Sequence, residues 1–427
     1  MIMAEDSPAA ASGESGSPAE NSAPLLREPA DGVPDPIATA AGLARAAVAL
    51  AAGSGPIAVD AERASGYRYS QRAYLVQLRR AGAGTVLIDP LPIGVAGFRP
   101  LADVVNETEW ILHAAPQDLP CLAELGLRPA RLFDTELAGR LLGDERVALG
   151  TMVEQWLHVR LGKEHSAADW STRPLPREWL AYAALDVELL IPLHDVLARQ
   201  LADAGKVEWA AEEFEAIRAS PPAAPRDDPW RRTSGLHAIR TRRELAIVRS
   251  LWYARDAWAA ERDVSPGRLL PDSAIIAAAR ANPSGPAELA QLPTFRGPRQ
   301  RRAISRWWNA VAEALVLPDA DLPQPVSRAD AMPPTSRWRE RDPKAAARLA
   351  ACRHVISTLA ATHRVLPQNL LAGDIVRRLA WEPPDPPDAT GVSITLARHG
   401  ARPWQIGLTA SRLADALTKA RAAEPTA

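Results

Sequence analysis

The stretch that decides the fold is "PIAVDAERASGYRYSQRAYLVQL", residues 56–78. Its first apolar run ends in two acids, Asp60 and Glu62, two residues apart. Side chains at this spacing on a β-strand point to the same face, so both carboxylates are expected side by side, next to a hydrophobic core. A divalent cation bound between them would relieve their repulsion. Two solvated acids at the end of a strand are the ordinary alternative for this motif alone.

The pattern around this stretch predicts a mixed α/β domain. Apolar runs at residues 73–80 and 85–91 flank a glycine-containing turn and predict a β-hairpin. A fourth strand-like run covers residues 109–115, and the apolar spacing then becomes helical. Such an order of strands and helices is typical of a layered α/β unit. The helical segments are expected at roughly 117–125, 134–142, 150–161 and 176–205.

The rest of the chain divides into a tail, two linkers and two helical domains. Low apolar content predicts a disordered acidic tail, and proline-rich composition predicts the linkers. "VSPGRLLPDSAII" at Val264 and "VLPQNLLAGDIVR" at Val365 match at a spacing of 101 residues, so the second helical domain is expected to be a divergent copy of the first. The predicted segments are the tail 1–36, the α/β domain 37–219, a linker 220–229, a helical domain 230–317, a proline-rich linker 318–343 and a helical domain 344–420.

Composition narrows the class of protein. The 427 residues include only two cysteines, too few for a disulfide framework or a cysteine zinc site. No apolar run approaches the roughly 20 residues that span a bilayer, and the N-terminus lacks the basic start of a secretory signal. We therefore expect a cytoplasmic protein without a membrane partner.

The charge is distributed unevenly. The net charge of −1 is the result of −6 over residues 1–36, −6 over residues 37–225 and +11 over residues 226–427. This asymmetry fits a metal-binding unit joined to a unit that binds a polyanion, although basic helical surfaces are also common without such a role.

Two further motifs extend the acidic pair. Asp118 stands at the start of a predicted helix, where the helix dipole alone also favours an acid. Tyr182 and Asp186 are four residues apart on a predicted helix, so they are neighbours on one face. Carboxylate oxygens are hard ligands that favour Mg²⁺ or Mn²⁺. Each motif has an ordinary structural explanation by itself, and the order of the three along the chain is the stronger signal.

The three motifs together resemble the DEDD superfamily of 3′→5′ exonucleases in its tyrosine-containing subgroup, and most of all ribonuclease D. The first motif lies in residues 59–78, the second in 112–143 and the third in 161–193. The resemblance implies a ribonuclease H-like mixed sheet flanked by helices, followed by two small all-α domains. Residues 230–317 resemble the HRDC domain, an auxiliary nucleic-acid-binding module, and residues 344–420 resemble a more divergent copy of it.

The same resemblance implies a set of site residues. Asp60, Glu62, Asp118 and Asp186 would hold two divalent cations, Mg²⁺ or Mn²⁺, and Tyr182 would orient the attacking water. Two residues of the loop before the third motif, Trp170 and Arg173, are expected to bind the substrate by base stacking and phosphate contact. One departure is Arg63, where the family more often has an apolar or aromatic residue, which bears on how the terminal nucleotide packs.

The implied substrate is RNA with a free 3′ end, in particular tRNA precursors, cleaved to nucleoside 5′-monophosphates without an obligatory protein partner. A proofreading-type DNA exonuclease is one alternative, because the same metal site serves that chemistry. A catalytically weak nucleic-acid-binding protein on the same fold is another. The helical domains favour RNA, and the presence of all four acids and Tyr182 favours catalysis.

Overall fold

A five-stranded mixed sheet forms the centre of the α/β domain in the computed structural model, which describes residues 23–162, 168–222, 224, 226–325 and 332–422. The strand order is β4-β3-β2-β5-β6. β2 pairs antiparallel with β3 and parallel with β5, so the predicted mixed sheet and hairpin are confirmed. The strands are β2 (Ser54–Arg63), β3 (Ala73–Ala81), β4 (Gly84–Ile88), β5 (Glu109–Leu112) and β6 (Arg131–Asp134).

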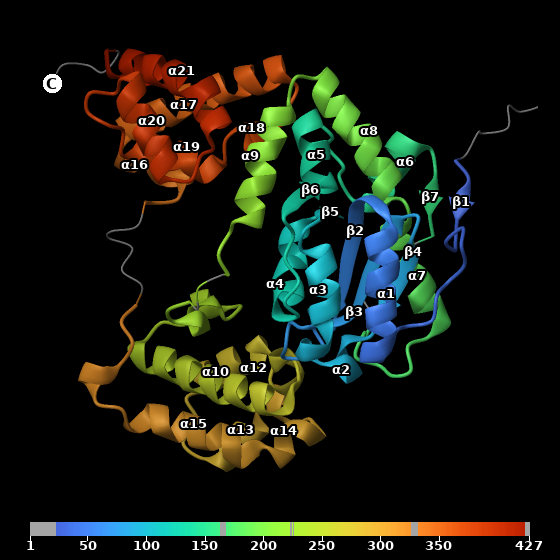
Figure 1. The fold of residues 1–427 in the computed structure, drawn as a ribbon. Coiled ribbons are helices and arrows are strands. Elements are labelled where there is room, and N and C mark those ends of the chain that lie inside the picture. Colours follow the sequence, from blue (N-terminus) through green and yellow to red (C-terminus); the bar gives the residue numbers. More distant parts are fainter. Residues whose placement is uncertain (1–22, 163–167, 223, 225, 326–331, 423–427) are drawn as a thin grey trace, which may run out of the picture.

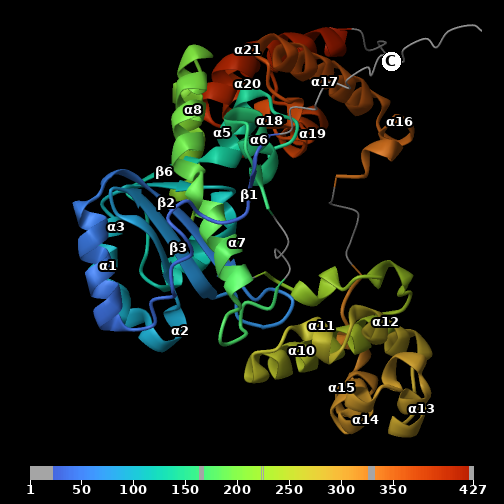
Figure 2. The ribbon, with the colours of Figure 1, turned by 90° about the vertical axis from the view of Figure 1, so that its right-hand side faces the viewer.

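Helices cover both faces of this sheet. Figure 2 shows α1 and α3 on one side of the sheet and α7 on the other. The central strand β2 is therefore buried on both faces, and Ile57, Ala58 and Val59 have no exposed surface. The helices are α1 (Ala40–Ala52), α2 (Pro90–Ile93), α3 (Arg99–Val105), α4 (Leu119–Glu124), α5 (Thr135–Leu142), α6 (Leu149–Leu157), α7 (Arg177–Glu188), α8 (Leu190–Asp203) and α9 (Val207–Arg218), with 3-10 turns η1 (Val95–Phe98) and η2 (Ala115–Gln117).

The long helix predicted across residues 176–205 is wrong in one respect, because it is two helices. α7 ends at Glu188, and α8 begins at Leu190 after a non-helical Leu189 with φ −105° and ψ 5°. Pro192 has no N–H to donate to the Glu188 carbonyl, so a continuous helix would lose a hydrogen bond here. The break lets α7 pack on β2, β3 and β4, while α8 packs on α5 and contacts β2 and β5.

The predicted disordered tail is also wrong in part. Residues 1–22 lie outside the described residues, but β1 (Leu25–Leu26) pairs in parallel with β7 (Arg160–Leu161). Asp31 lies 3.3 Å from Arg79 of β3, and Ile37 forms a bridge with Ile88 of β4. Composition alone could not show that residues 23–36 are structured, because the residues that they contact are far away in the sequence.

Two helical domains follow the α/β domain, as predicted, and Figure 1 shows them at opposite ends of it. The first consists of η3 (Pro229–Arg232), η4 (Leu236–Ala238), α10 (Arg242–Arg262), α11 (Pro266–Leu269), α12 (Asp272–Ala281), α13 (Pro286–Gln291), η5 (Pro293–Phe295), α14 (Pro298–Arg302), α15 (Ile304–Val316) and η6 (Asp319–Asp321). The second consists of η7 (Thr335–Arg337), α16 (Trp338–Arg341), α17 (Pro343–His363), α18 (Pro367–Leu370), α19 (Gly373–Trp381), α20 (Ala389–Arg398) and α21 (Pro403–Ala422).

The helix boundaries support the predicted duplication. α10 and α17 each have 21 residues, and they begin 101 residues apart. α11 and α18 are separated by the same spacing. Both long helices end in a left-handed residue, Asp263 with φ 48° and Arg364 with φ 51°.

Both helical domains contact the α/β domain through this left-handed corner. In the first domain, the Asp263 carboxylate accepts a hydrogen bond from the Ser70 N–H at 2.8 Å. In the second, the Arg364 carbonyl accepts one from Lys206 Nζ at 3.2 Å. The two copies thus dock with the same structural feature on different surfaces.

The proline-rich segment 318–343 is not a free linker throughout. Trp338 is fully buried and its ring lies 4.9 Å from that of Trp381, so the end of this segment belongs to the second helical domain. At its start, Leu322 packs into the core of the first helical domain. Among the described residues, no helix is both long and apolar enough to cross a membrane.

Candidate active site

The five residues predicted to carry the chemistry line one cavity of about 470 Å³ at the carboxyl end of β2. Asp60 and Glu62 come from β2, Asp118 from the start of α4, and Tyr182 and Asp186 from α7. The structure therefore brings together residues that are separated by up to 126 positions in the sequence. Their neighbours in the lining are Ala61, Arg63, Ser65, His113, Ala114, Gln117, Glu136, Ala148, Leu149, Ala168 and Leu190.

Three of the four acids form a compact cluster. Asp60, Glu62 and Asp186 each offer a carboxylate oxygen, and these oxygens lie within 4.8 Å of one another. Such a set of hard, partly buried oxygens fits a divalent cation of the Mg²⁺ or Mn²⁺ type. Asp118 lies outside this group, and its Oδ1 is 4.0 Å from Arg63 Nε.

Local structure explains how Asp118 reaches the cavity. The Asp134 carboxylate accepts hydrogen bonds from the N–H groups of Ala114 at 3.1 Å, Ala115 at 2.8 Å and Leu137 at 3.2 Å. The bond from Leu137 caps α5. The bonds from Ala114 and Ala115 fix the turn that precedes α4, in which Ala114 adopts the left-handed conformation. Asp134 thus caps α5 and also holds the turn before Asp118.

Crowding of buried acids shifts their proton affinities. Burial, and then the charges of Asp118, Asp186 and Glu62, raise the pKa of Asp60 well above its ordinary value. Burial also raises the pKa of Asp118 to about 7, although the guanidinium of Arg63 opposes this shift. A bound cation would reverse this balance, since its charge favours the ionised carboxylates.

Tyr182 is held in its protonated form. Burial, and then the nearby charges of Asp186, Glu62 and Asp60, raise its pKa far above the ordinary range. Its hydroxyl also donates a hydrogen bond to Asp186. A phenol in this state can donate a hydrogen bond to a water but cannot act as a base near neutral pH.

The two predicted substrate contacts do not have the expected exposure. Trp170 is only 1% exposed, and its ring packs on Trp179 and Tyr182, so no face is open for a base to stack on. Arg173 donates to both oxygens of Asp89, at 2.6 and 3.0 Å, and to the Tyr74 carbonyl at 2.7 Å. Both side chains therefore fix the loop before α7, and the prediction of direct stacking by Trp170 is wrong.

One residue near the site has no counterpart in the sequence-based prediction. Gln77 is fully buried in β3, directly opposite Asp60 in the strand pairing, and neither polar atom of its amide has a hydrogen-bond partner. Opposite residues of an antiparallel pair share a face of the sheet, so Gln77 lies on the side of Asp60. The sequence signal that could have identified Gln77 is a polar residue inside the otherwise apolar run "AYLVQL".

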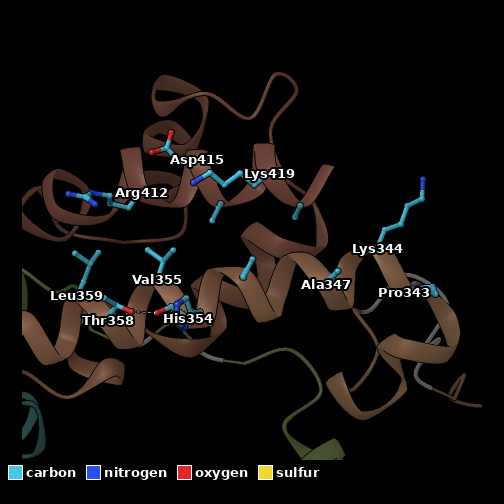
Figure 3. A pocket seen from close by; sticks show the side chains of 13 residues that line it. Pro343, Lys344, Ala347, His354, Val355, Thr358, Leu359, Arg412, Asp415 and Lys419 are labelled. Carbon is cyan, nitrogen blue, oxygen red and sulfur yellow. Dashed lines mark hydrogen bonds between the residues drawn. The ribbon is translucent and has the colours of Figure 1, made fainter. Parts of the chain in front are cut away.

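A larger cavity lies elsewhere but lacks the required chemistry. It has a volume of about 760 Å³ and opens between α17 and α21 of the second helical domain. Figure 3 shows apolar side chains such as Val355 and Leu359 there, with Asp415 as the one acid in its lining. A single carboxylate cannot form the ligand set found at β2.

Comparisons with known proteins agree with this geometry. Residues 35–202 match the family described as 3′-5′ exonuclease, residues 244–311 match the HRDC domain, and residues 331–417 match the family described as 3′ to 5′ exonuclease C-terminal domain. Ribonuclease D of Gluconacetobacter diazotrophicus is 30% identical over 78% of this chain and 82% of its own length. The chain belongs to the ribonuclease D family.

Solved structures extend the match over nearly the whole chain. A protein from Bifidobacterium adolescentis is 38% identical, with a TM-score of 0.87 over 92% of this chain and 99% of its own. Escherichia coli RNase D, an exoribonuclease involved in structured RNA processing, is 27% identical, with a TM-score of 0.67 over 90% of this chain and 98% of its own. The prediction of a 3′→5′ exoribonuclease is thus confirmed. The exonuclease fold of the ribonuclease D family depends on metal ions and acts on RNA.

Proposed function

We propose that this member of the ribonuclease D family trims the 3′ ends of tRNA precursors or other stable RNAs in the cytoplasm and releases nucleoside 5′-monophosphates. The observation that carries this proposal is the cavity in which all four acids and Tyr182 meet. Its half-buried carboxylates provide the negative charge that concentrates divalent cations at a phosphodiester.

Asp60, Glu62, Asp118 and Asp186 are the proposed metal ligands, and two Mg²⁺ or Mn²⁺ ions are the proposed occupants. When bound, such ions lower the pKa of a water and stabilise charge on the attacking and leaving oxygens. Glu62 and Asp60 lie on a rigid central strand, and Asp186 on a helix packed against it, so the ligands are preorganised.

Tyr182 is proposed to orient the attacking water. Its hydroxyl remains protonated and lies next to Asp186, so it can donate to the water while a carboxylate receives the proton. The role is one of positioning, because phosphoryl transfer depends mostly on alignment and charge stabilisation.

Digestion of one RNA, labelled at its 5′ end or at its 3′ end, tests this proposal with Mg²⁺, with Mn²⁺ and with a chelator. We expect immediate release of labelled mononucleotide from the 3′-labelled RNA, a ladder of shortened products from the 5′-labelled RNA, and no product with chelator. An Asp186→Asn variant should bind the RNA but release no mononucleotide. Cleavage by that variant at the wild-type rate would remove Asp186 from the metal site.

A further inference from the structure

A second pocket, rich in arginine, lies on the first helical domain. It has a volume of about 630 Å³ and forms where the end of α10 meets α14 and the start of α15. Its floor is Trp258, which is 9% exposed. The remaining lining residues are Arg262, Pro298, Arg299, Arg302, Ala303 and Arg306.

The arginines of this pocket carry charge that the protein does not neutralise. The guanidinium carbons of Arg262 and Arg306 lie 4.9 and 4.8 Å from the centre of the Trp258 ring, so cation–π contacts hold both side chains in place. Within the described residues, none of the four arginines forms an ion pair with a carboxylate. The pocket therefore presents four exposed, partly preorganised guanidinium groups, which are suited to phosphate oxygens.

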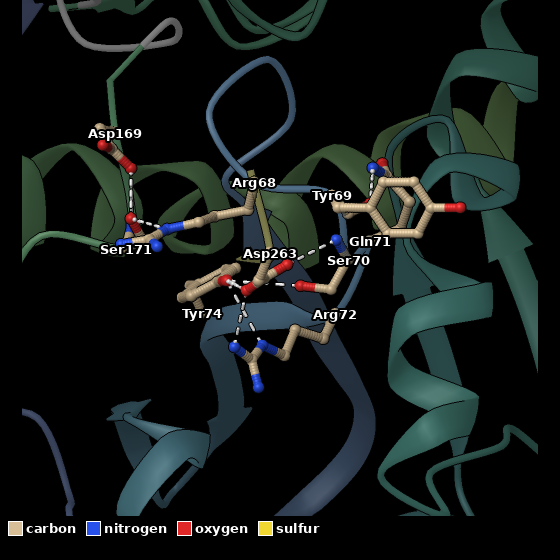
Figure 4. A network of polar contacts seen from close by, with 9 residues as sticks. All are labelled: Arg68, Tyr69, Ser70, Gln71, Arg72, Tyr74, Asp169, Ser171 and Asp263. Carbon is tan, nitrogen blue, oxygen red and sulfur yellow. Dashed lines mark hydrogen bonds and ion pairs between the residues drawn. The ribbon is translucent and has the colours of Figure 1, made fainter. Parts of the chain in front are cut away.

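The pocket is fixed to the segment that leaves the catalytic strand. Arg262 is followed directly by Asp263, which accepts hydrogen bonds from Ser70 N–H at 2.8 Å, Arg72 Nη2 at 3.0 Å and the Tyr74 hydroxyl at 3.3 Å. Figure 4 shows Asp263 at the centre of this network. The network joins the end of α10 to the beginning of β3.

A second connection comes from the α14 side of the pocket. Arg299 Nη1 donates to the Arg268 carbonyl at 2.6 Å, and Arg268 Nε donates to the Gly66 carbonyl at 2.8 Å. The guanidinium of Arg268 also lies 4.2 Å from the centre of the Tyr67 ring. Gly66 is only four residues beyond Glu62, so the pocket and the acid cluster are held by two ends of one short segment.

We propose that this arginine pocket binds backbone phosphates of the RNA strand whose 3′ end lies in the active site, at nucleotides upstream of the cleaved bond. The equivalent positions in the second helical domain, 101 residues later, hold Leu359 for Trp258 and His363 for Arg262. The pairing of a tryptophan with an arginine one turn later, which forms one side of the pocket, is therefore absent from the second copy. This inference rests on the exoribonuclease activity of the chain and adds an RNA subsite to it.

The test compares two double variants that remove equal charge. Arg302→Gln/Arg306→Gln changes the pocket, whereas Arg296→Gln/Arg301→Gln changes exposed arginines of the same region that do not line it. Binding of a single-stranded 20-nucleotide RNA is measured in chelator at several salt concentrations, and hydrolysis of an RNA dinucleotide is measured with Mg²⁺. A dinucleotide without a 5′-phosphate has one phosphodiester, the bond that is cleaved, so it has no upstream phosphate for the pocket and reports on the catalytic centre alone.

We expect the pocket variant to bind the 20-nucleotide RNA about tenfold or more weakly, with a salt dependence reduced by about two phosphate contacts. Its dinucleotide hydrolysis should remain at the wild-type level, and the control variant should bind the long RNA nearly as wild type does. Equal weakening in both double variants would overturn the proposal, since it would indicate diffuse attraction.

A pocket variant that also loses dinucleotide hydrolysis would point to altered domain packing, and ultraviolet cross-linking of the wild-type complex then decides. Cross-links between the long RNA and residues 258–262 or 298–306 support the subsite, and their absence overturns it. Failure of the wild type itself to release mononucleotides from the 20-nucleotide RNA with Mg²⁺ would instead count against the proposed active site, so the two failures are distinguishable.

Discussion

Arg63 Nε lies 4.0 Å from Asp118 Oδ1, beside the three acids that cluster at the end of β2. The Arg63 side chain is only partly exposed, with 26% of its surface open to solvent. Its guanidinium partly neutralises Asp118, the one predicted metal ligand outside the cluster. A cation that approaches Asp118 must therefore compete with Arg63.

Replacing Arg63 by Ala should strengthen metal binding. A unit charge at about 4 Å contributes roughly 1 kcal/mol or more, which corresponds to an affinity gain of about fivefold. Calorimetric titration with Mn²⁺ measures this gain directly, and Arg63→Lys, which retains the charge, serves as the matched control. Identical Mn²⁺ affinity in the wild type and the alanine variant would show that Arg63 does not compete with the metal.

Tyr182→Phe should lower kcat by about 10- to 100-fold and leave KM almost unchanged, because a misaligned water slows the chemical step without weakening RNA binding. Steady-state kinetics on a short single-stranded RNA provide both constants. Trp179→Phe alters a neighbouring aromatic residue of α7 outside the cavity lining and should keep kcat near the wild-type value. A matching fall of kcat in both variants would argue for general disturbance of α7.

Gln77→Leu should weaken Mn²⁺ binding by about tenfold, the usual effect of losing a polar group that orients a metal ligand. The physical reason is that the buried amide shares a face with Asp60 and needs a partner, which the metal-loaded site can supply directly or through water. Calorimetry and a thermal melt in chelator are measured together. A variant that melts higher with unchanged Mn²⁺ affinity would mean that Gln77 is only a buried polar defect.

The metal-free protein should lose stability as the pH rises from about 4 to about 7. The pKa of Asp118 is raised from an ordinary value of 3.8 to about 7, so over this range the folded state binds a proton that the unfolded state has released. Melting temperatures in chelator should therefore fall more steeply with rising pH in the wild type than in Asp118→Asn. Added Mg²⁺ should remove most of this fall, and parallel pH profiles for both proteins would contradict the assignment.

Gly143→Ala should be more destabilising than Gly126→Ala. Both glycines have positive φ, 98° and 78°, so both substitutions strain the backbone by about 1 kcal/mol or more. Only at Gly143 would the added methyl also meet the Arg364 carbonyl, at 2.7 Å, where the second helical domain docks. Thermal melts compare the two variants, and small-angle scattering should detect a released domain in Gly143→Ala alone. Equal melting temperatures would show that this contact carries little of the docking.

The sequence by itself determined most of the secondary-structure elements and the order of the catalytic motifs along the chain. Period-two and helical spacing are local properties, so the strand ending in Asp60 and Glu62, the hairpin, and the one-turn spacing of Tyr182 and Asp186 could be predicted from neighbouring residues. The repeat at 101 residues likewise anticipated matching helices in both helical domains.

Only the tertiary structure decided which side chains meet. Three features depend on contacts with residues far away in the sequence: the pairing of Arg63 with Asp118, the burial of Trp170 and the ordered structure of residues 23–36. Spacing along the chain does not encode such contacts. The same holds for the docking of both helical domains through their left-handed corners. A carboxylate pair becomes a candidate metal site because packing of α4 and α7 against β2 adds the third and fourth acids and removes most of the water around them.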